Sequence, residues 1–543
     1  MKKFLLLSLF IGLISCQTKE SVDSLIINGN IYTVNSEFEK AEAFAIKDGK
    51  FIEVGNSKDL QNKYIANTII DAKGKSILPG LIDAHCHFLT LGQLQQQVNL
   101  VGTTSFEDMI NKVVEFQNKN NLPYIRGRGW DQNDWEDKTM PTKEILDSLF
   151  PNTPVALTRI DGHASFCNKA ALDLGNVTIN SNIEGGEIEV KNGELTGILI
   201  DNAEQLVLDN WPKPTKEQLI DALLKAQDIC LTYGLTSLSD AGPDIYTSSW
   251  IDKIDLIDSL QSTGDLRIRL YMMVPGTSKN LDFYLNNGIK KTNKLNVRSF
   301  KFYADGALGS RGALLREPYT DKPETHGIPV MSLNEIGAAA KRIANSEFQM
   351  NTHAIGDSAN HAVLNTYKNV LQDKPNRRWR IEHAQVVSPD DFKYFDDILP
   401  SIQPTHATSD MYWAEDRVGP VRIKGGYAFK DLLNAYGKVA LGTDFPVEQV
   451  SPFLTFYAAV SRQDLDQYPE GGFQIENALT REETLKGMTI WAAYSNFEEN
   501  EKGSIEAGKF ADFVILDKDI MTVDVAEIPN IKVINTFIDG KAQ

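Results

Sequence analysis

The sequence predicts an α/β fold, and three observations support this. Through the middle of the chain, short apolar runs alternate with longer segments of helical pattern. Such alternation is typical of strand–helix–strand units that build a parallel sheet. Both ends instead carry short alternating segments with Asn-Gly or Asp-Gly turn signals, which indicate β hairpins. The chain of 543 residues is long enough for more than one domain.

Eight apolar runs predict the strands of the middle region. They are Leu81–Ala84, Leu235–Ser239, Ile268–Val274, Val297–Tyr303, Phe348–Thr352, Trp379–Glu382, Ile398–Gln403 and Val439–Gly442. Eight strands alternating with helices fit a distorted (β/α)8 barrel of the TIM type over residues 78–502. The first gap, about residues 88–220, is much longer than one crossover needs, so it predicts an insertion with its own structure.

The two β-rich ends predict one small domain. Residues 24–77 and 503–541 share the same texture of short strands and turns, as in Ser24–Val34 and Ala511–Asp517. Because they flank a different middle region, we expect one β domain built from both termini.

The first residues predict an export signal that is not part of the fold. Met1-Lys-Lys is basic, and the apolar stretch from Phe4 to Ser15 is too short for a membrane span of about 20 residues. Leu13-Ile-Ser-Cys16 resembles the lipobox of bacterial lipoproteins, which implies removal of residues 1–15 and a lipid on Cys16. The alternative is a plain secretory signal with a chance cysteine.

The lipobox interpretation predicts an exported bacterial lipoprotein, anchored to a membrane on the periplasmic side or in the outer membrane. Gln17 fits the outer membrane through resemblance to known lipoprotein sorting. The formal net charge of -18 argues against nucleic acid as a partner, because its phosphates are recognised by Lys and Arg. Cys86, Cys167 and Cys230 remain, an odd number that does not indicate a disulfide framework.

Ligand-type side chains end five of the eight predicted strands. His85 and His87 follow the first run, and residues i and i+2 of a strand point to the same face. The other strand-end residues are Lys301, His353, His383 and Asp444. Active sites of such barrels form at the carboxyl ends of the strands. A single strand-end histidine would indicate a core or surface residue, but the joint pattern predicts a metal site, most commonly for zinc.

This pattern resembles the amidohydrolase superfamily, and its wider context resembles the amidohydrolase-3, YtcJ-like family. The matching segments are Gly129-Trp-Asp131, Asp161-Gly-His-Ala164, Asp305–Arg311, Thr352–Asp357 and Gly508–Asp512. The resemblance covers about residues 24–541. It implies a distorted (β/α)8 barrel with a small composite β-sandwich built from both termini. It also implies one or two Zn2+ ions, or other divalent first-row metals.

The resemblance also implies how two metals would be held. His85, His87 and Asp444 would bind one ion, His353 and His383 the other, and a carboxylated Lys301 would bridge them. The modification makes chemical sense, because an ammonium repels a cation whereas a carbamate supplies two oxygens. The alternative for Lys301 is an ordinary charged side chain at the barrel mouth.

The predicted function is metal-dependent hydrolysis of a carbon–nitrogen bond other than a peptide bond. Zinc lowers the pKa of water to about 7, which gives hydroxide at neutral pH, and polarises a carbonyl. Asp444 is placed to take the proton and deliver it to the leaving amine. The substrate would be a small N-acyl, N-formyl or cyclic amide. Alternatives are a deaminase, esterase or isomerase on the same site, or a non-catalytic ligand-binding surface lipoprotein.

Four further residues are predicted to contact substrate, each with a structural alternative. Trp130 and Asp131 would line the pocket, although the tryptophan fits core packing equally well. His163 would face substrate or act as a hydrogen-bonded structural histidine. Arg311 would hold a substrate carboxylate or carbonyl, or form a salt bridge within the barrel. His326 and His406 stay unassigned.

Overall fold

The computed structural model describes residues 19–160, 164–183, 186–242 and 250–543. The chain divides into two compact units, Met1–His87 with Ile229–Gln543, and Phe88–Asp228. None of the helices in the described ranges combines the length and apolar character that crossing a bilayer requires.

Eight parallel strands form a nearly closed barrel in the larger unit. In chain order and in spatial order they are β8 (Leu81–Cys86), β15 (Leu235–Asp240), β16 (Arg269–Pro275), β18 (Leu295–Tyr303), β19 (Gln349–Ala354), β20 (Arg380–His383), β21 (Leu399–Ile402) and β22 (Ala440–Leu441). All eight predicted runs therefore form barrel strands, and this part of the prediction is confirmed. The strands are buried on both faces, so apolar residues recur along them. Some buried positions are nevertheless polar, such as Arg380 and Glu382 on β20.

The barrel closes between its last and first strands through backbone hydrogen bonds. Asp444 N donates to His85 O, and His87 N donates to Phe445 O, both at 2.8 Å. Gly442 permits this approach, because a Cβ there would lie 2.4 Å from His85 N. The closure brings the two ends that carry predicted ligands side by side.

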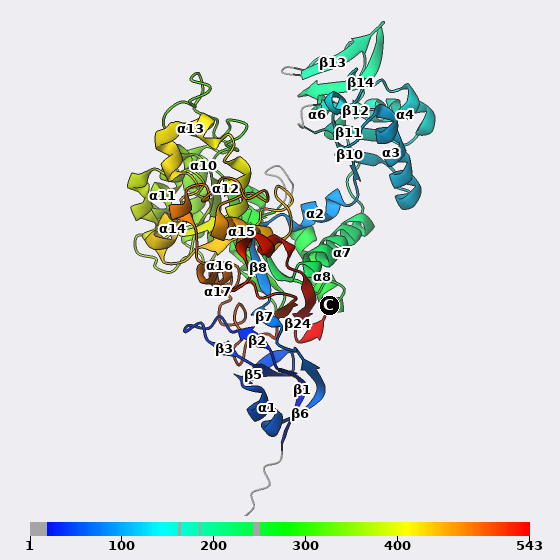
Figure 1. Cartoon of the computed structure of the whole chain (residues 1–543). Coiled ribbons are helices and arrows are strands. Elements are labelled where there is room, and N and C mark those ends of the chain that lie inside the picture. The colour runs from blue at the N-terminus through cyan, green and yellow to red at the C-terminus, as the bar shows by residue number, and fades with distance from the viewer. Residues whose placement is uncertain (1–18, 161–163, 184–185, 243–249) are drawn as a thin grey trace, which may run out of the picture. The chain divides into compact units, whose positions relative to one another are not determined.

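Helices cover the outside of the barrel. They are α8 (Ile251–Thr263), α9 (Ser278–Asn287), α10 (Leu333–Ala344), α11 (Asp357–Leu371), α12 (Pro404–Asp410), α13 (Ala414–Arg422), α14 (Phe429–Tyr436), α15 (Pro452–Ser461), α16 (Arg481–Gly487) and α17 (Ile490–Ser495). Figure 1 shows α10 to α14 gathered beside one another. In α10 a capping box of Ser332 and Glu335 starts the helix, and its buried residues recur at helical spacing from Ile336 to Ala344.

Strands from both ends of the chain share one sheet. Its order is β25 (Lys541–Ala542), β24 (Val533–Ile538), β23 (Phe513–Leu516), β7 (Ser76–Pro79), β2 (Asn30–Tyr32) and β3 (Lys40–Ala41). A second sheet contains β5 (Lys50–Gly55), β4 (Ala43–Lys47), β1 (Glu20–Ile27) and β6 (Tyr64–Asp71), beside α1 (Ser57–Lys63). Phe44, Ile77, Phe513 and Phe537 pack in one core that joins the two sheets. Figure 1 shows β7 in blue next to β24 in dark red.

The unit Phe88–Asp228 has its own sheet and cores. The sheet order is β13 (Gly186–Lys191), β14 (Glu194–Asp201), β12 (Ala164–Cys167), β11 (Val155–Arg159), β10 (Ile125–Trp130) and β9 (Val98–Asn99). Its helices are α2 (Phe88–Leu94), α3 (Phe106–Asn120), α4 (Glu144–Leu149), α5 (Lys169–Leu174), α6 (Ala203–Leu208) and most of α7 (Lys216–Thr232). Cys86, Cys167 and Cys230 are buried and free, as their odd number predicted.

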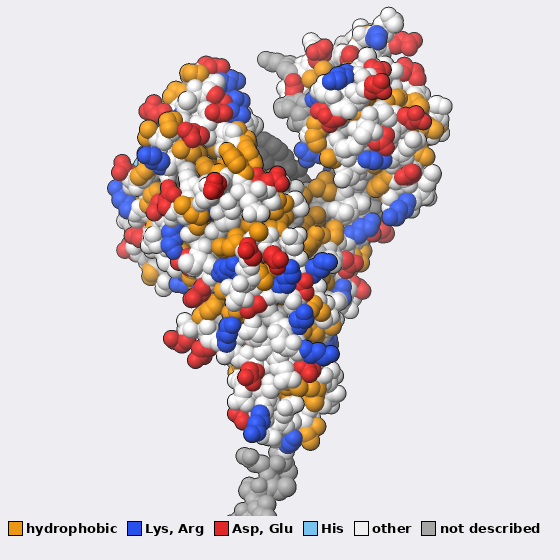
Figure 2. Space-filling view, viewed as in Figure 1, with side chains coloured by type: hydrophobic (Ala, Val, Ile, Leu, Met, Phe, Trp, Pro, Cys, Tyr) orange, Lys and Arg blue, Asp and Glu red, His pale blue; other side chains and the backbone are white. Residues whose placement is uncertain are grey.

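Charged side chains of both signs share the surface. On the face in Figure 2, Asp and Glu side chains are interspersed with Lys, Arg and apolar groups. The net charge of -18 is therefore not gathered into one patch on this face.

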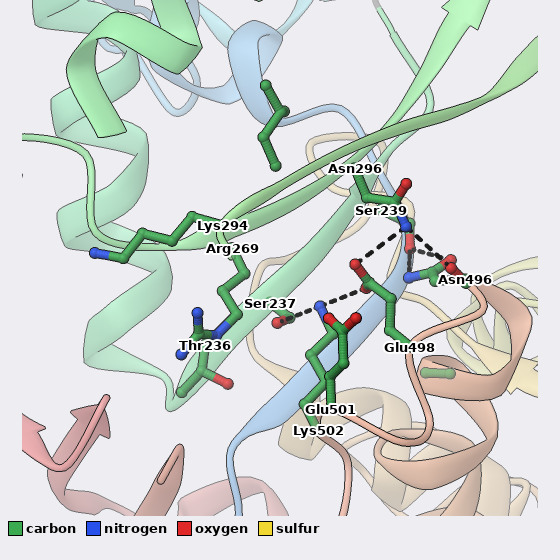
Figure 3. Close-up of polar contacts among 12 residues, drawn as sticks. Thr236, Ser237, Ser239, Arg269, Lys294, Asn296, Asn496, Glu498, Glu501 and Lys502 are labelled. Carbon is green, nitrogen blue, oxygen red and sulfur yellow. Dashed lines mark hydrogen bonds and ion pairs between the residues drawn. The ribbon is translucent and has the colours of Figure 1, made fainter. Parts of the chain in front are cut away.

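A buried polar cluster lies toward the amino ends of the barrel strands. This basal network, drawn in Figure 3, consists of Ser237, Ser239, Asn296, Asn496, Glu498 and Lys502. Lys502 Nζ lies 2.6 Å from Glu498 Oε2 and donates to Ser237 Oγ at 2.9 Å. Asn296 Nδ2 donates to Glu498 Oε1 and to Asn496 O, both at 3.2 Å. Lys291 Nζ donates to Glu498 Oε1 at 2.7 Å. These contacts connect the segment after α17 to strands β15 and β18.

Candidate metal centre

The carboxyl ends of β8 and β22 bring three predicted ligands together. His87 Nε2 lies 3.2 Å from Asp444 Oδ1, and His85 Nε2 lies 3.6 Å from the same atom. One ligand atom from each of these residues lies within 4.8 Å of the others. His85 and Asp444 are buried, and His87 is partly accessible. The alternation of the strand places both histidines on one face, as the sequence predicted.

Lys301 reaches the same point from β18. Its side chain is buried, and Nζ lies 3.3 Å from His85 Nε2. Burial lowers the pKa of Lys301 to about 8, against the attraction of Glu382 and Asp444. The charged form therefore still predominates at pH 7, but the uncharged fraction is far larger than for a lysine of ordinary pKa.

His353 and His383 come from the ends of β19 and β20. Their ring centroids are 4.5 Å apart, and the His383 ring is 4.8 Å from that of His85. Burial, followed by the charge of Lys301, lowers the pKa of His353 to about 3. Burial and the neighbouring His353 hold the pKa of His383 well below its usual value. Both rings are therefore neutral imidazoles, the form that binds metals.

Two of these side chains sit on strained backbone. His383 has φ of +74° and Asp444 has φ of +62°. The left-handed region is costly for residues other than glycine, and it is found preferentially at functional sites. The strain coincides here with two strand ends that carry predicted ligands.

Fixed oxygen acceptors orient three of the imidazole rings. His85 Nδ1 contacts Glu382 Oε2 at 2.5 Å, and His383 Nδ1 contacts Gln403 Oε1 at 2.8 Å. His87 Nδ1 contacts Gly242 O. An imidazole whose Nδ1–H donates to such an acceptor presents the lone pair of Nε2 on its other side. In His85 and His87, the Nε2 atoms left free in this way are the ones that face Asp444.

The arrangement fits a divalent metal. Asp444 Oδ1 and His353 Nε2 are buried and have no hydrogen-bond partner within the described residues. Two ligands about 2.1 Å from a tetrahedral metal lie about 3.4 Å apart. The separations of 3.2 and 3.6 Å around Asp444 Oδ1 bracket that value. Burial raises the pKa of Asp444, but the neighbouring His406 and His87 outweigh it and hold the pKa well below normal, so the carboxylate is ionised.

Comparison with known proteins agrees with this centre. The model of the amidohydrolase family matches residues 68–542. The chain belongs to this family. The YtcJ protein of Bacillus subtilis (strain 168) is 31% identical over 522 residues, which cover 94% of this chain and 98% of that protein. N-substituted formamide deformylase of Arthrobacter pascens is 25% identical over 542 residues, covering 95% and 97% of the two chains.

A solved structure extends the comparison to three dimensions. An uncharacterized metal-dependent hydrolase from Pyrococcus horikoshii OT3 aligns with a TM-score of 0.78 and 28% identity, covering 92% of this chain and 99% of that one. Together with the His and Asp cluster, this makes the protein a metal-dependent hydrolase of the amidohydrolase superfamily.

Two of the predicted substrate contacts of this amidohydrolase have structural roles. Trp130 is fully buried in the core of the inserted unit, and its Nε1 donates to Leu157 O at 2.7 Å. The packing alternative therefore holds for Trp130, which has no exposed surface for a ligand. Arg311 forms a bidentate pair with Asp321, at 3.1 and 2.6 Å. This is the salt bridge within the barrel that the sequence left open.

The roles predicted for Asp131, His163 and Cys16 are not decided by the structure. Asp131 accepts hydrogen bonds from Arg159 Nη2 at 2.7 Å and from Asn133 N at 2.9 Å, within the inserted unit. His163 and Cys16 lie outside the described residues. Asp131 and His163 thus stay predictions as substrate contacts.

Sequence reasoning missed Glu382 and Arg380 as supports of the centre. Arg380 Nε donates to Glu382 Oε1 at 2.7 Å, and Arg380 Nη2 donates to Ala84 O at 2.7 Å. Although burial opposes it, Arg380 and His85 hold the pKa of Glu382 well below its usual value. The signal available was their i, i+2 spacing on a predicted strand, which puts both on the face that points into the barrel.

Sequence reasoning also left His406 unassigned. His406 lies on α12, just after β21, and its Nε2 is 3.2 Å from Asp444 Oδ2. Burial lowers the pKa of His406, but Asp444 and Glu448 outweigh it and raise the pKa to about 10. The available signal was its place three residues after the seventh apolar run, at the barrel end that holds the other ligands.

Proposed function

We propose that this protein hydrolyses an amide-like C–N bond of a small molecule. The observation that carries the proposal is the buried convergence of imidazole Nε2 atoms on an ionised Asp444 at the carboxyl end of the barrel. The deformylase relative acts, by its name, on N-substituted formamides, which contain such a bond. N-formyl, N-acyl and cyclic amides are therefore the substrate class.

The metal would be Zn2+ or another divalent first-row ion. His85, His87 and Asp444 would hold one ion, and His353 and His383 would hold a second. Lys301 would bridge them as a carbamate. Its lowered pKa supports this role, because the uncharged amine adds to CO2, forming an N–C bond and releasing one proton.

The catalytic work of the chain falls mainly on Asp444. A divalent metal, when bound, makes water more acidic and polarises the substrate carbonyl. Asp444 accepts the proton of the attacking water on a carboxylate oxygen and gives it to the leaving nitrogen as the C–N bond breaks. The buried walls around Asp444 limit bulk water and strengthen its electrostatic interactions.

The test is a panel of N-substituted formamides, N-acyl amines and cyclic amides, with release of amine or acid measured by chromatography. The wild-type protein should hydrolyse at least one class. Asp444→Asn should lower kcat/KM by about 10²–10⁴-fold, the usual contribution of a general acid–base. Asp321→Asn, at an exposed carboxylate of the same barrel, is the control and should keep activity. Turnover of only esters or amino-heterocycles would contradict amide hydrolysis.

We further propose that the mature protein is exported and anchored by a lipid on Cys16, with residues 1–15 removed. The lipobox-like segment supports this. Mass spectrometry of the N-terminal peptide should find a diacylglyceryl Cys16, and Cys16→Ala should release the protein from the membrane fraction. An unmodified Cys16, or a soluble wild-type protein, would contradict it.

A further inference from the structure

We propose that His406 is a further ligand of the metal centre, with Glu448 as the carboxylate that orients it. His383, His406 and Asp444 would then form a second metal-binding group that shares Asp444 with His85 and His87. The proposal rests on the metal dependence of the protein and does not depend on which bond it hydrolyses.

The orientation of the His406 ring is the first argument. Nδ1 lies 3.1 Å from Glu448 Oε1, and Nε2 lies 3.2 Å from Asp444 Oδ2. A neutral imidazole that donates Nδ1–H to Glu448 turns a lone pair toward the Asp444 carboxylate. Two acceptors at this distance repel each other unless a cation or a proton lies between them. In the metal-free protein, Asp444 and Glu448 favour a proton on His406, and this proton fills the position. A metal ion bound by both atoms would replace it.

The second argument is the pattern that His406 shares with the other rings of the centre. His85 and His383, like His406, have Nδ1 against a side-chain oxygen. Metal-binding histidines almost always have such a partner for the second ring nitrogen. Glu448 is itself fixed, because Ser409 Oγ donates to its Oε1 at 2.6 Å.

His361 also has its Nδ1 against a carboxylate, but it is not a predicted metal ligand. Its Nδ1 also faces a carboxylate, Asp391 Oδ1, at 3.0 Å. Its Nε2, however, lies 2.9 Å from the amide Nδ2 of Asn365, a donor. Nε2 of His361 therefore has a donor within the protein, whereas Nε2 of His406 faces a carboxylate oxygen.

Distance is the third argument. One ligand atom from each of His383, His406 and Asp444 lies within 4.8 Å of the others. The 3.2 Å between His406 Nε2 and Asp444 Oδ2 is close to the separation of about 3.4 Å expected for two ligands of a tetrahedral ion. Gln403, which orients His383, lies three residues before His406, so one short segment supports both rings.

The experiment is a Co2+ titration of the metal-free full chain, followed by visible absorption and by the metal content after dialysis. His406→Ala should lose one bound equivalent, or bind it at least tenfold more weakly, and its Co2+ spectrum should change. Glu448→Gln, which keeps the shape of the side chain, should weaken the same equivalent about 10–100-fold. His361→Ala is the matched control and should reproduce the wild-type titration.

Two outcomes would overturn the proposal. An unchanged stoichiometry and Co2+ spectrum in His406→Ala would mean that His406 is an imidazolium between two carboxylates. A change of the same size in His361→Ala would mean that any histidine loss perturbs the fold. Circular dichroism checks that each variant is folded, and Glu448→Gln tests the same equivalent if His406→Ala folds poorly. The titration involves no substrate, so failure of the amide proposal leaves its result intact.

Discussion

The metal centre and the basal network are both buried, charged clusters within one barrel, and they differ in how their charges are compensated. In the basal network, Lys502 and Lys291 both lie within 2.7 Å of Glu498. In the metal centre, no carboxylate of the described residues lies within 4.0 Å of Lys301 Nζ, and Asp444 Oδ1 has no hydrogen-bond partner there. The two clusters therefore differ in whether the buried lysine has a carboxylate within ion-pair distance.

The difference separates a structural role from a chemical one. Paired buried charges connect β15, β18 and the segment after α17, and each lysine of this network has a carboxylate partner. Arg269 extends this structural set, because it donates to Asp512 at 2.6 and 2.8 Å and so joins strand β16 to the segment just before β23. Four predictions test the contrast.

The largest effect is expected from Glu498→Ala in the basal network. It leaves Lys502 buried without its carboxylate, and breaking a buried pair from one side costs about 3–5 kcal/mol. Urea unfolding of the metal-free protein measures this loss. Glu501→Ala, which removes only the more exposed partner of Lys291, is the control and should cost under about 1 kcal/mol. Equal losses of unfolding free energy in the two variants would contradict a special contribution of the buried pair to stability.

The contribution of the Glu498–Lys502 pair to stability should also depend on pH. Burial raises the pKa of Glu498, but Lys502 and Lys291 outweigh it and lower the pKa to about 2, from 4.5. The depressed folded-state pKa gives stability that is present above pH 4.5 and is lost as the pH falls toward 2, about 3 kcal/mol in all. Unfolding of Glu498→Gln, followed from pH 6 to 3, should therefore depend less steeply on pH than that of the wild type. Parallel profiles would contradict the assignment.

A moderate effect on metal binding is expected from Glu382→Gln. The substitution removes the charge that orients His85 but keeps the shape of the Glu382 side chain. Metal affinity should therefore fall about 10–100-fold, or about 1.4–2.7 kcal/mol. Competition with a chelator measures the affinity. Glu347→Gln, in an exposed pair with Arg377, is the matched control. An unchanged metal affinity in Glu382→Gln would contradict the role of Glu382 in orienting His85 for metal binding.

The smallest effect on stability is expected from Lys301→Met. Because Lys301 is buried without a paired carboxylate, its replacement should change the unfolding free energy of the metal-free protein by under about 1 kcal/mol, or increase it. Chemical unfolding in the presence of a chelator measures this. A loss of about 3 kcal/mol or more, as for Glu498→Ala, would make Lys301 part of the structural network.

The sequence predicts the barrel and the strand-end residues well, because both follow from local patterns. Buried parallel strands are continuous apolar runs, and the residue after each run lies at the active end of the barrel. His85, His353 and Asp444 were found in this way, and the structure brings them within one small region.

What the sequence did not predict depends on contacts between distant segments. Glu382 meets His85 across 297 positions, and no local pattern reports such a pair. His406 stands on a short helix after its strand, outside the strand-end rule. Trp130 fits a family segment, but a matching segment does not say whether a side chain faces the core or a ligand.

Metal analysis tests the central claim most directly. Plasma mass spectrometry on the purified protein without residues 1–16 gives the metal equivalents of the wild type and of Lys301→Ala. The account predicts about two equivalents of zinc or another divalent metal in the wild type, with at least one lost in Lys301→Ala. One equivalent that Lys301→Ala leaves unchanged would contradict the lysine bridge. No bound metal, even after reconstitution, would contradict the metal centre itself.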